Sequence, residues 1–353
     1  MRTVGAVLAA VGLAAASLVA QTAKLPPGSM YGADPSYKVP RTIDGKPDLQ
    51  GVWSNNSVTP MTRPTQWKDK DKLTDKELED LKMLIAQNAD DGGDAIFQNQ
   101  VQLALDAKEK GKFEQVSYDK TTGNYNQFWM AGRDWDTRTS LVIDPPNGQM
   151  PPLTADAQQR RARRGPIGAL APEETVARPR PTGPEDLPLG ERCVSFGAPR
   201  TGAGYNSYLQ IVQSPSHVVL LQEMAHDARM VPLGSPQHLN TAVRQWLGDP
   251  RGRWEGDVLV VETTNYRGGF MGSTADVKVT ERFIRVSKDF INWVITVDDP
   301  KTWTQPWSFM VRLKKTNDQI YEYACHEGNY AMPGILAGAR VQEAKENVSK
   351  KSN

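Results

Sequence analysis

The stretch GDPRGRWEGDVLVVETTNY, residues 248–266, decides the fold class. Its centre holds the turn residues Glu255-Gly256-Asp257, and a run of aliphatic and β-branched residues follows them. Turn residues between two short β-forming runs are typical of a β-hairpin. Glu255 and Asp257 are better explained as turn residues than as catalytic acids. The two carboxylates of a glycosidase have to lie on either side of the substrate bond, and this spacing is not evidence of such a pair.

Similar hairpin patterns extend on both sides of this stretch. Downstream lie VTERFIRV, FINWVITV, WSFMVRLKK and QIYEYACH, and upstream lie YLQIVQS, HVVLLQEM and ARMVPL. Tight turns join these runs and no helical crossover separates them, which predicts an antiparallel meander. We therefore expect a mainly β protein whose meander closes into a lipocalin-like barrel or forms a sandwich, with a small helical insertion.

The remaining segments are arranged around this β-rich domain, which we place at residues 48–340. Its first strand is expected in DLQGVWSNN, 48–56, with Trp53 plugging one end of the core. Thr74 and Glu77 form a capping box for a helix over 73–88, and a second helix over 95–110 ends at Gly111. Residues 73–111 are thus the helical insertion. We expect an extended segment at 21–47, a short strand at 139–143, a long surface loop at 155–190 and a polar tail at 341–353.

The first 20 residues have the layout of a signal peptide. Arg2 precedes an uncharged run of small and apolar residues, and small residues near Ala20 suit a cleavage site. The run is short and rich in Ala and Gly, which argues against a membrane anchor. The sequence therefore predicts a periplasmic or secreted protein without a stable membrane span after cleavage. In an oxidising compartment Cys193 and Cys325 are a disulfide candidate, and a thiolate nucleophile is the alternative.

Charge and motifs exclude several classes of function. The formal net charge is +1, so the chain lacks the basic excess typical of proteins that bind nucleic acid or anionic membranes. The sequence has no Gly-x-Ser-x-Gly elbow, no phosphate loop and no dinucleotide fingerprint, which argues against the usual serine hydrolases, kinases and Rossmann oxidoreductases. A small-molecule substrate or ligand is the expected partner.

Several long motifs occur in one order along the chain: TSLVIDPPNGQMPPLT, ERCVSF, GDPRGRWEGDVLVVETTNY, TVDDPKTWTQPW and YEYACHEGNY. Together they resemble a family of exported bacterial proteins of unknown function, over about residues 40 to 340. The resemblance implies export but supplies no reaction. The likeness to lipocalin-type barrels is an architectural analogy, and a fold does not by itself give a function.

Two stretches centred on histidine hold the candidate catalytic residues. If 320–326 is a strand, alternation places His326 and Cys325 on opposite faces, and Glu327 follows at the strand end. In QEMAHDARM, 222–230, the pair His226-Asp227 lies between two apolar runs. A histidine beside a carboxylate is suited to acid–base catalysis, because its pKa lies near neutrality.

The predicted roles follow from this arrangement. His226 is the base or acid, Asp227 or Glu327 orients it, His326 is the complementary acid, and Arg229 holds a substrate anion. The predicted substrate-binding residues are Tyr125, Trp129, Arg133, His238 and Tyr330. The predicted function is an exported enzyme of lyase, isomerase or hydrolase type. It would act on a small cyclic, phenolic or sugar-like molecule by acid–base chemistry centred on histidine.

Three alternatives stay open. A lipocalin-like carrier would use the same aromatic residues to bind a ligand without turnover. A metal-dependent enzyme would bind a divalent ion through the same histidines, although the chain has no His-x-His, His-x-x-x-His or Cys-x-x-Cys spacing, so no cofactor is predicted. An interaction module of the cell envelope would instead expose an apolar patch.

Overall fold

The computed structural model describes residues 25–90, 100–111, 133–164, 180–202, 206–234 and 237–351. The strands are β1 (Gly51–Ser54), β2 (Val142–Asp144), β3 (Tyr208–Gln213), β4 (His217–Gln222), β5 (Ala228–Pro232), β6 (Asp249–Glu255), β7 (Val258–Thr264), β8 (Lys278–Arg285), β9 (Phe290–Asp298) and β10 (Trp307–Thr316). The helices are α1 (Asp75–Asp90), α2 (Gln100–Lys110), α3 (Ala155–Arg164) and α4 (Ala331–Lys351), with single 3-10 turns η1 (Thr65–Trp67), η3 (Pro184–Asp186) and η4 (Met224–His226). The predicted signal peptide, residues 1–20, lies outside the described residues.

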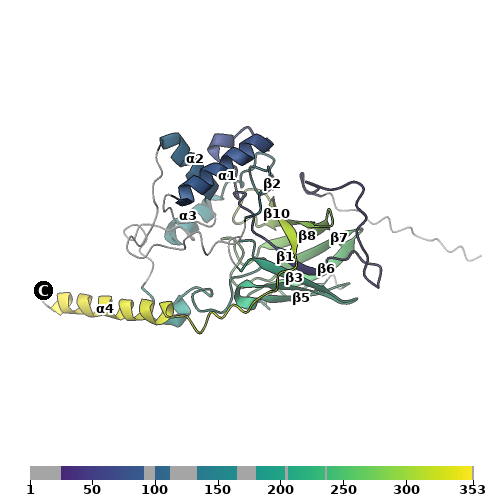
Figure 1. Ribbon diagram of the computed structural model, residues 1–353. Coiled ribbons are helices and arrows are strands. Elements are labelled where there is room, and N and C mark those ends of the chain that lie inside the picture. Colours follow the sequence, from purple (N-terminus) through teal and green to yellow (C-terminus); the bar gives the residue numbers. More distant parts are fainter. Residues whose placement is uncertain are drawn as a thin grey trace, which may run out of the picture.

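All the strands of the described residues belong to one ten-stranded sheet, which forms the body of the molecule (Figure 1). Its order is β5-β4-β3-β1-β10-β9-β8-β7-β6, β2 pairs with β10, and the neighbouring strands run antiparallel. The mainly β class is therefore confirmed. Within the described residues the expected closure into a barrel is not shown, because no ladder joins the end strands β5 and β6. These two strands contact each other, and an isolated bridge links Leu233 to Gly252. An open sheet or a sandwich fits this topology.

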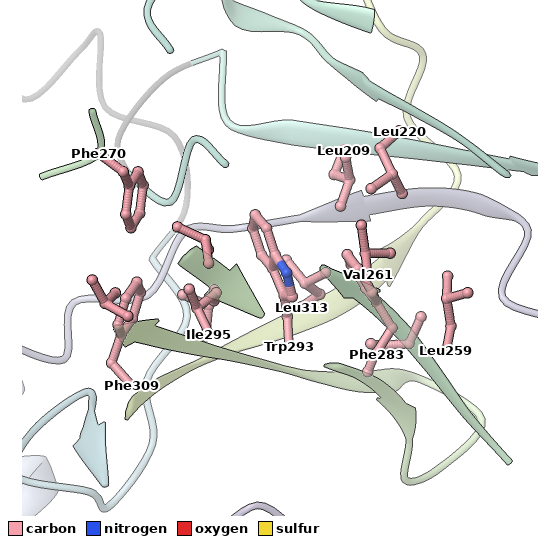
Figure 2. Close-up of a cluster of buried hydrophobic side chains, with 14 of the residues drawn as sticks. Leu209, Leu220, Leu259, Val261, Phe270, Phe283, Trp293, Ile295, Phe309 and Leu313 are labelled. Carbon is pink, nitrogen blue, oxygen red and sulfur yellow. The ribbon is translucent and has the colours of Figure 1, made fainter. Parts of the chain in front are cut away.

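The hydrophobic core lies on one face of this sheet, where alternate residues of successive strands pack together. Figure 2 shows Trp293 of β9 among leucine, valine and phenylalanine side chains from several strands. The members include Leu209, Leu220, Val261, Phe283, Trp293, Ile295, Phe309 and Leu313. Trp53 belongs to the same core, and its indole N–H donates to the carbonyl of Leu49 at 2.9 Å. Large side chains thus cover the face on which a lipocalin-like carrier would bind its ligand.

The opposite face of β8–β10 is also covered. Ile284, Val294 and Met310 form a smaller cluster, and Leu25 and Tyr31 pack against it from the N-terminal segment. Strands buried on both faces have near-continuous apolar runs, as β9 does in FINWVITV. The covering segment also forms one wall of a surface pocket described below.

The predicted helical insertion is present as α1 and α2, which lie together at one end of the sheet (Figure 1). Leu73, Leu81 and Val101 form their shared apolar contact. The predicted capping box is confirmed, since the Glu77 carboxylate accepts hydrogen bonds from the Thr74 amide at 2.8 Å and the Thr74 hydroxyl at 2.9 Å. The ion pair with Lys70, followed by these two bonds, lowers the pKa of Glu77 to about 2. The contribution of this carboxylate to stability is therefore present at neutral pH and is lost as the pH falls towards 2.

Replacing Thr74 with alanine should lower the free energy of unfolding by about 1 kcal/mol, because the first turn of α1 loses its cap. Urea denaturation at neutral pH measures this difference. Thr304→Ala is the matched control, since Thr304 is exposed and its hydroxyl makes no hydrogen bond within the described residues. Equal stability of the two variants would contradict the role of the cap.

The structure differs from the expectation for three segments. Residues 320–326 are not a strand, because β10 already pairs with β1, β2 and β9 and offers no free edge to the chain that follows it. The predicted loop at 155–190 begins with α3 and contains η3, while 165–179 lie outside the described residues. The predicted polar tail belongs to α4, which projects away from the sheet (Figure 1).

Helix α4 is attached to the segment before β3. The Arg340 guanidinium donates to the carbonyls of Pro181 and Thr182 at 2.7 and 3.2 Å, and Arg180 pairs with Glu346. Across the described ranges, no helix is long and apolar enough to span a bilayer.

Candidate active site

The predicted disulfide between Cys193 and Cys325 is confirmed, and it joins segments that lie 132 residues apart in the chain. The Asn329 amide strengthens this junction by donating to the carbonyl of Glu191 at 2.8 Å and to the Cys193 sulfur at 3.3 Å. The ring of Tyr323 meets the ring of Phe196 edge to face, with 6.0 Å between centroids. The disulfide thus brings the YEYACHEGNY motif against residues 191–196.

Asp227 lies at the same corner, directly after η4. Its Oδ2 accepts hydrogen bonds from the Ser195 hydroxyl at 2.9 Å and from the Phe196 amide at 3.2 Å. Within the described part of the chain no donor contacts Oδ1. Burial raises the pKa of Asp227, although the two donors and the charges of His226 and Arg200 oppose the shift. This half-buried carboxylate is therefore held through one of its two oxygens.

The backbone around Asp227 is held in an uncommon conformation. Cys193, Ala225 and His226 take φ values of 55, 58 and 45°. The left-handed region is unfavourable for residues other than glycine, asparagine and aspartate, and such residues gather at functional sites because the surrounding structure has to hold them. Three of them lie within two residues of Ser195 or Asp227. We call the set Ser195, Phe196, His226 and Asp227, with the disulfide that joins Cys193 to Cys325, the disulfide corner.

A buried acid connects the disulfide corner to the C-terminal segment. Glu223 is buried and accepts a hydrogen bond from the Tyr321 amide at 3.3 Å. Its own amide donates to the carbonyl of Tyr208 at 3.0 Å, and its carbonyl accepts from the His226 amide at 3.1 Å. These bonds fix the position of η4 and therefore of Asp227.

The structure places the predicted catalytic residues in two different environments. His226 and Asp227 are neighbours at the disulfide corner, and the disulfide brings His326 and Glu327 to it on an exposed turn. Within the described residues the side chains of His226, His326 and Glu327 make no hydrogen bond. Arg229 does not join them. It lies on the inner face of β5, is 2% exposed, and forms a bidentate pair with the buried Glu281 at 2.5 and 2.7 Å.

The Asp227 carboxylate accepts no hydrogen bond from Arg133, His238 or Tyr330, which are the predicted substrate-binding residues that the structure describes. His238 lies between Asp249 and Glu262, with its ring nitrogens 3.1 and 3.3 Å from their carboxylate oxygens. Tyr330 is 82% exposed. Arg133 is half-buried, and burial lowers the pKa of its guanidinium. Tyr125 and Trp129 lie outside the described residues.

Ser195 and Phe196 are the members of the site that sequence reasoning missed. Both belong to the ERCVSF motif and follow Cys193 closely, so a disulfide near Asp227 would have been the signal for them. No group of three or more His, Cys, Asp or Glu side chains in the described segments is arranged to bind a metal ion.

Comparison with protein-family models, curated proteins and solved structures finds no match to this chain. The resemblance to a family of exported bacterial proteins therefore stays a prediction.

Proposed function

We propose that the protein is an exported enzyme that removes a proton from a small organic molecule, or from water, with Asp227 as the general base. The observation that carries this proposal is the carboxyl group itself, which is half-buried, held through Oδ2 by two donors and without a donor on Oδ1 among the described residues. A positioned carboxylate with a raised pKa is a stronger base than an ordinary aspartate. Lyases, isomerases and hydrolases all use such a group.

In this proposal His226 favours the ionised form of Asp227, and Asp227 does not orient the histidine ring. No hydrogen bond joins its ring to Asp227, but its charge favours the ionised carboxylate when the ring is protonated. His326 is proposed as the complementary acid, because the disulfide brings it to the same corner and its side chain is exposed to a substrate. These roles revise the arrangement in which Asp227 orients His226.

Export is supported by two independent features. The first 20 residues have the pattern of a signal peptide, and the disulfide is of a kind that persists in oxidising compartments. We therefore place the enzyme in the periplasm or outside the cell.

Asp227→Asn should abolish turnover while leaving the fold intact. A panel of small cyclic ketones, lactones and phenolic esters is incubated in D₂O with the wild type, and NMR detects deuterium uptake or conversion. We expect at least one member of the panel to react, and the variant to lose about 100-fold or more of that rate. Asp289→Asn is the matched control, because Asp289 is exposed in the turn between β8 and β9. Absence of any reaction, or equal rates in the wild type and Asp227→Asn, would overturn the proposal.

The stability of the same variant checks that its loss of activity is chemical. Burial raises the pKa of Asp227 in the folded protein, so folding favours the protonated form. The wild type should therefore lose stability relative to Asp227→Asn as the pH rises from about 4 towards neutrality, because the unfolded carboxyl titrates near 3.9. Thermal denaturation at several pH values measures this. If Asp227→Asn is less stable than the wild type at pH 7 and the difference in stability is the same at pH 4, the role of Asp227 is structural.

A further inference from the structure

A pocket with a basic lining lies on the face of the sheet opposite the core, away from the segments of the disulfide corner. Its volume is about 290 Å³, and its walls come from the N-terminal segment 27–31, the stretch 63–72 and the region of β2. Three basic side chains line it, Arg63, Lys72 and Arg138, together with the single acid Asp71. We call this the Tyr31 pocket. Its volume is just below the range for small-molecule sites, which is about 300–1,000 Å³, so a compact ligand would suit it.

Three cationic side chains lie close to the ring of Tyr31. The Lys72 ammonium and the Arg138 guanidinium lie 5.5 and 5.2 Å from the ring centroid, and the Arg312 guanidinium lies at 5.4 Å. The Tyr31 hydroxyl and the Thr137 hydroxyl are 2.9 Å apart, which fixes the ring. Attraction to the face of an aromatic ring offsets part of the repulsion between such cations but does not neutralise their charge.

Only one of these cations has its own counter-ion. Arg138 pairs with Asp136 at 2.7 Å, and both side chains are buried. Over the described residues, Arg63, Lys72 and Arg312 have no carboxylate within ion-pair distance. Burial lowers the pKa of Arg312, and the charge of Asp136, which pairs with Arg138, opposes this shift only in part. The pocket and its rim thus carry an excess of positive charge.

Arg63 is the side chain that most clearly points to a ligand. It is 9% exposed, and its two terminal nitrogens donate to the carbonyls of Lys68 and Pro146 at a distance of 3.3 Å each. Its Nε has no acceptor. A buried N–H without an acceptor is costly, and a buried guanidinium without a carboxylate costs more. A bound anion would remove both costs.

The remaining walls of the pocket are apolar. Pro27, Val142, Ile143 and Pro146 line it beside the basic groups. We propose that the Tyr31 pocket binds a small organic anion, a carboxylate on a compact single ring. The carboxylate would lie against Arg63 and Lys72, and the ring would contact Ile143 and Pro146. The apolar wall favours this class over inorganic phosphate, which has no apolar body. This site is independent of the proposed catalysis at Asp227.

Isothermal titration calorimetry of the purified, disulfide-bonded protein tests this proposal. The probes are benzoate, its neutral analogue benzamide and inorganic phosphate, at an ionic strength of about 10 mM, where exposed charges are little screened. Benzoate should bind to one site, and both benzamide and phosphate should bind at least about tenfold more weakly, because each lacks one of the two recognised features. Failure of benzoate to saturate, or equal binding of either other probe, would overturn the assignment.

Lys72→Gln is the decisive variant, because Lys72 is exposed and its replacement does not disturb the core. It should weaken benzoate binding about tenfold or more, as expected for the loss of one ionic contact. Lys68→Gln removes the same charge from a neighbouring exposed side chain that does not line the pocket, and it should bind benzoate like the wild type. If Lys72→Gln and Lys68→Gln weaken benzoate binding equally, the effect is one of overall charge, and the Tyr31 pocket is not the binding site. Asp227→Asn should retain benzoate binding, which separates this result from the test of Asp227 as a general base.

Discussion

Replacing Glu281 with glutamine should lower the free energy of unfolding by about 3–5 kcal/mol, because the buried guanidinium of Arg229 loses the carboxylate that pairs with it. Arg229 and Glu281 are 2% and 0% exposed, and the guanidinium donates two hydrogen bonds, of 2.5 and 2.7 Å, to the carboxylate. Burial alone would lower the pKa of Arg229, but Glu281 outweighs it and raises the value. The indole of Trp293 also donates to Glu281, at 3.1 Å, so the carboxylate connects β5 to β8 and β9 through the core.

Urea denaturation at pH 7 measures this loss. Glu255→Gln is the matched control, since Glu255 pairs with Arg253 at 2.7 Å near the surface, and such pairs contribute about 1 kcal/mol or less. The double variant Arg229→Met, Glu281→Leu should recover most of the stability, because apolar residues avoid the cost of burying two charges. A loss below about 1 kcal/mol in Glu281→Gln would contradict the described pairing.

The second large effect is expected from the disulfide. The double variant Cys193→Ser, Cys325→Ser should lose about 2–5 kcal/mol of stability, near the upper end of that range, because the closed loop is long. The bond joins residues 132 positions apart, and without it the segment 319–330 has no strand pairing to hold it. The wild type under reducing conditions should show the same loss.

Urea denaturation with and without reductant measures the effect of the disulfide. Reductant should shift the wild type and leave the serine variant unchanged, because only the wild type has a bond to break. The serine variant should also lose turnover, since Ser195 follows Cys193 closely and donates to Asp227. Equal stability of the wild type in the two conditions would contradict a bond that stabilises the fold.

The hairpins could be predicted from the sequence because their information is local. Gly256, with a φ of 58°, supplies the turn between β6 and β7, and a run of aliphatic and β-branched residues follows the turn. The capping box of α1 is equally local. The pairing of strands that are distant in the sequence could not be predicted in this way. Strand β1 inserts between β3 and β10 and occupies the edge that a strand at 320–326 would have needed.

The candidate site was predictable in part. The pair His226-Asp227 and the disulfide were found from residue types and compartment. The burial of Arg229 could have been predicted from ARMVPL, because strand alternation places Arg229 on the same face as Val231. Val231 is buried, whereas Met230 on the other face is exposed. The apolar character of Met230 obscured that alternation. Ser195 and the left-handed residues around Asp227 depend on tertiary contacts that no periodicity records.

The central claim is that Asp227 is the general base of an enzyme, and the pH dependence of kcat/KM for a substrate found in the panel tests it most directly. A base has to be ionised, so kcat/KM should rise with pH through an apparent pKa above the ordinary aspartate value of about 3.9. This rise should disappear in Asp227→Asn and persist in Asp289→Asn. A rise that persists in Asp227→Asn, or a rate that falls over the same pH range, would contradict the account.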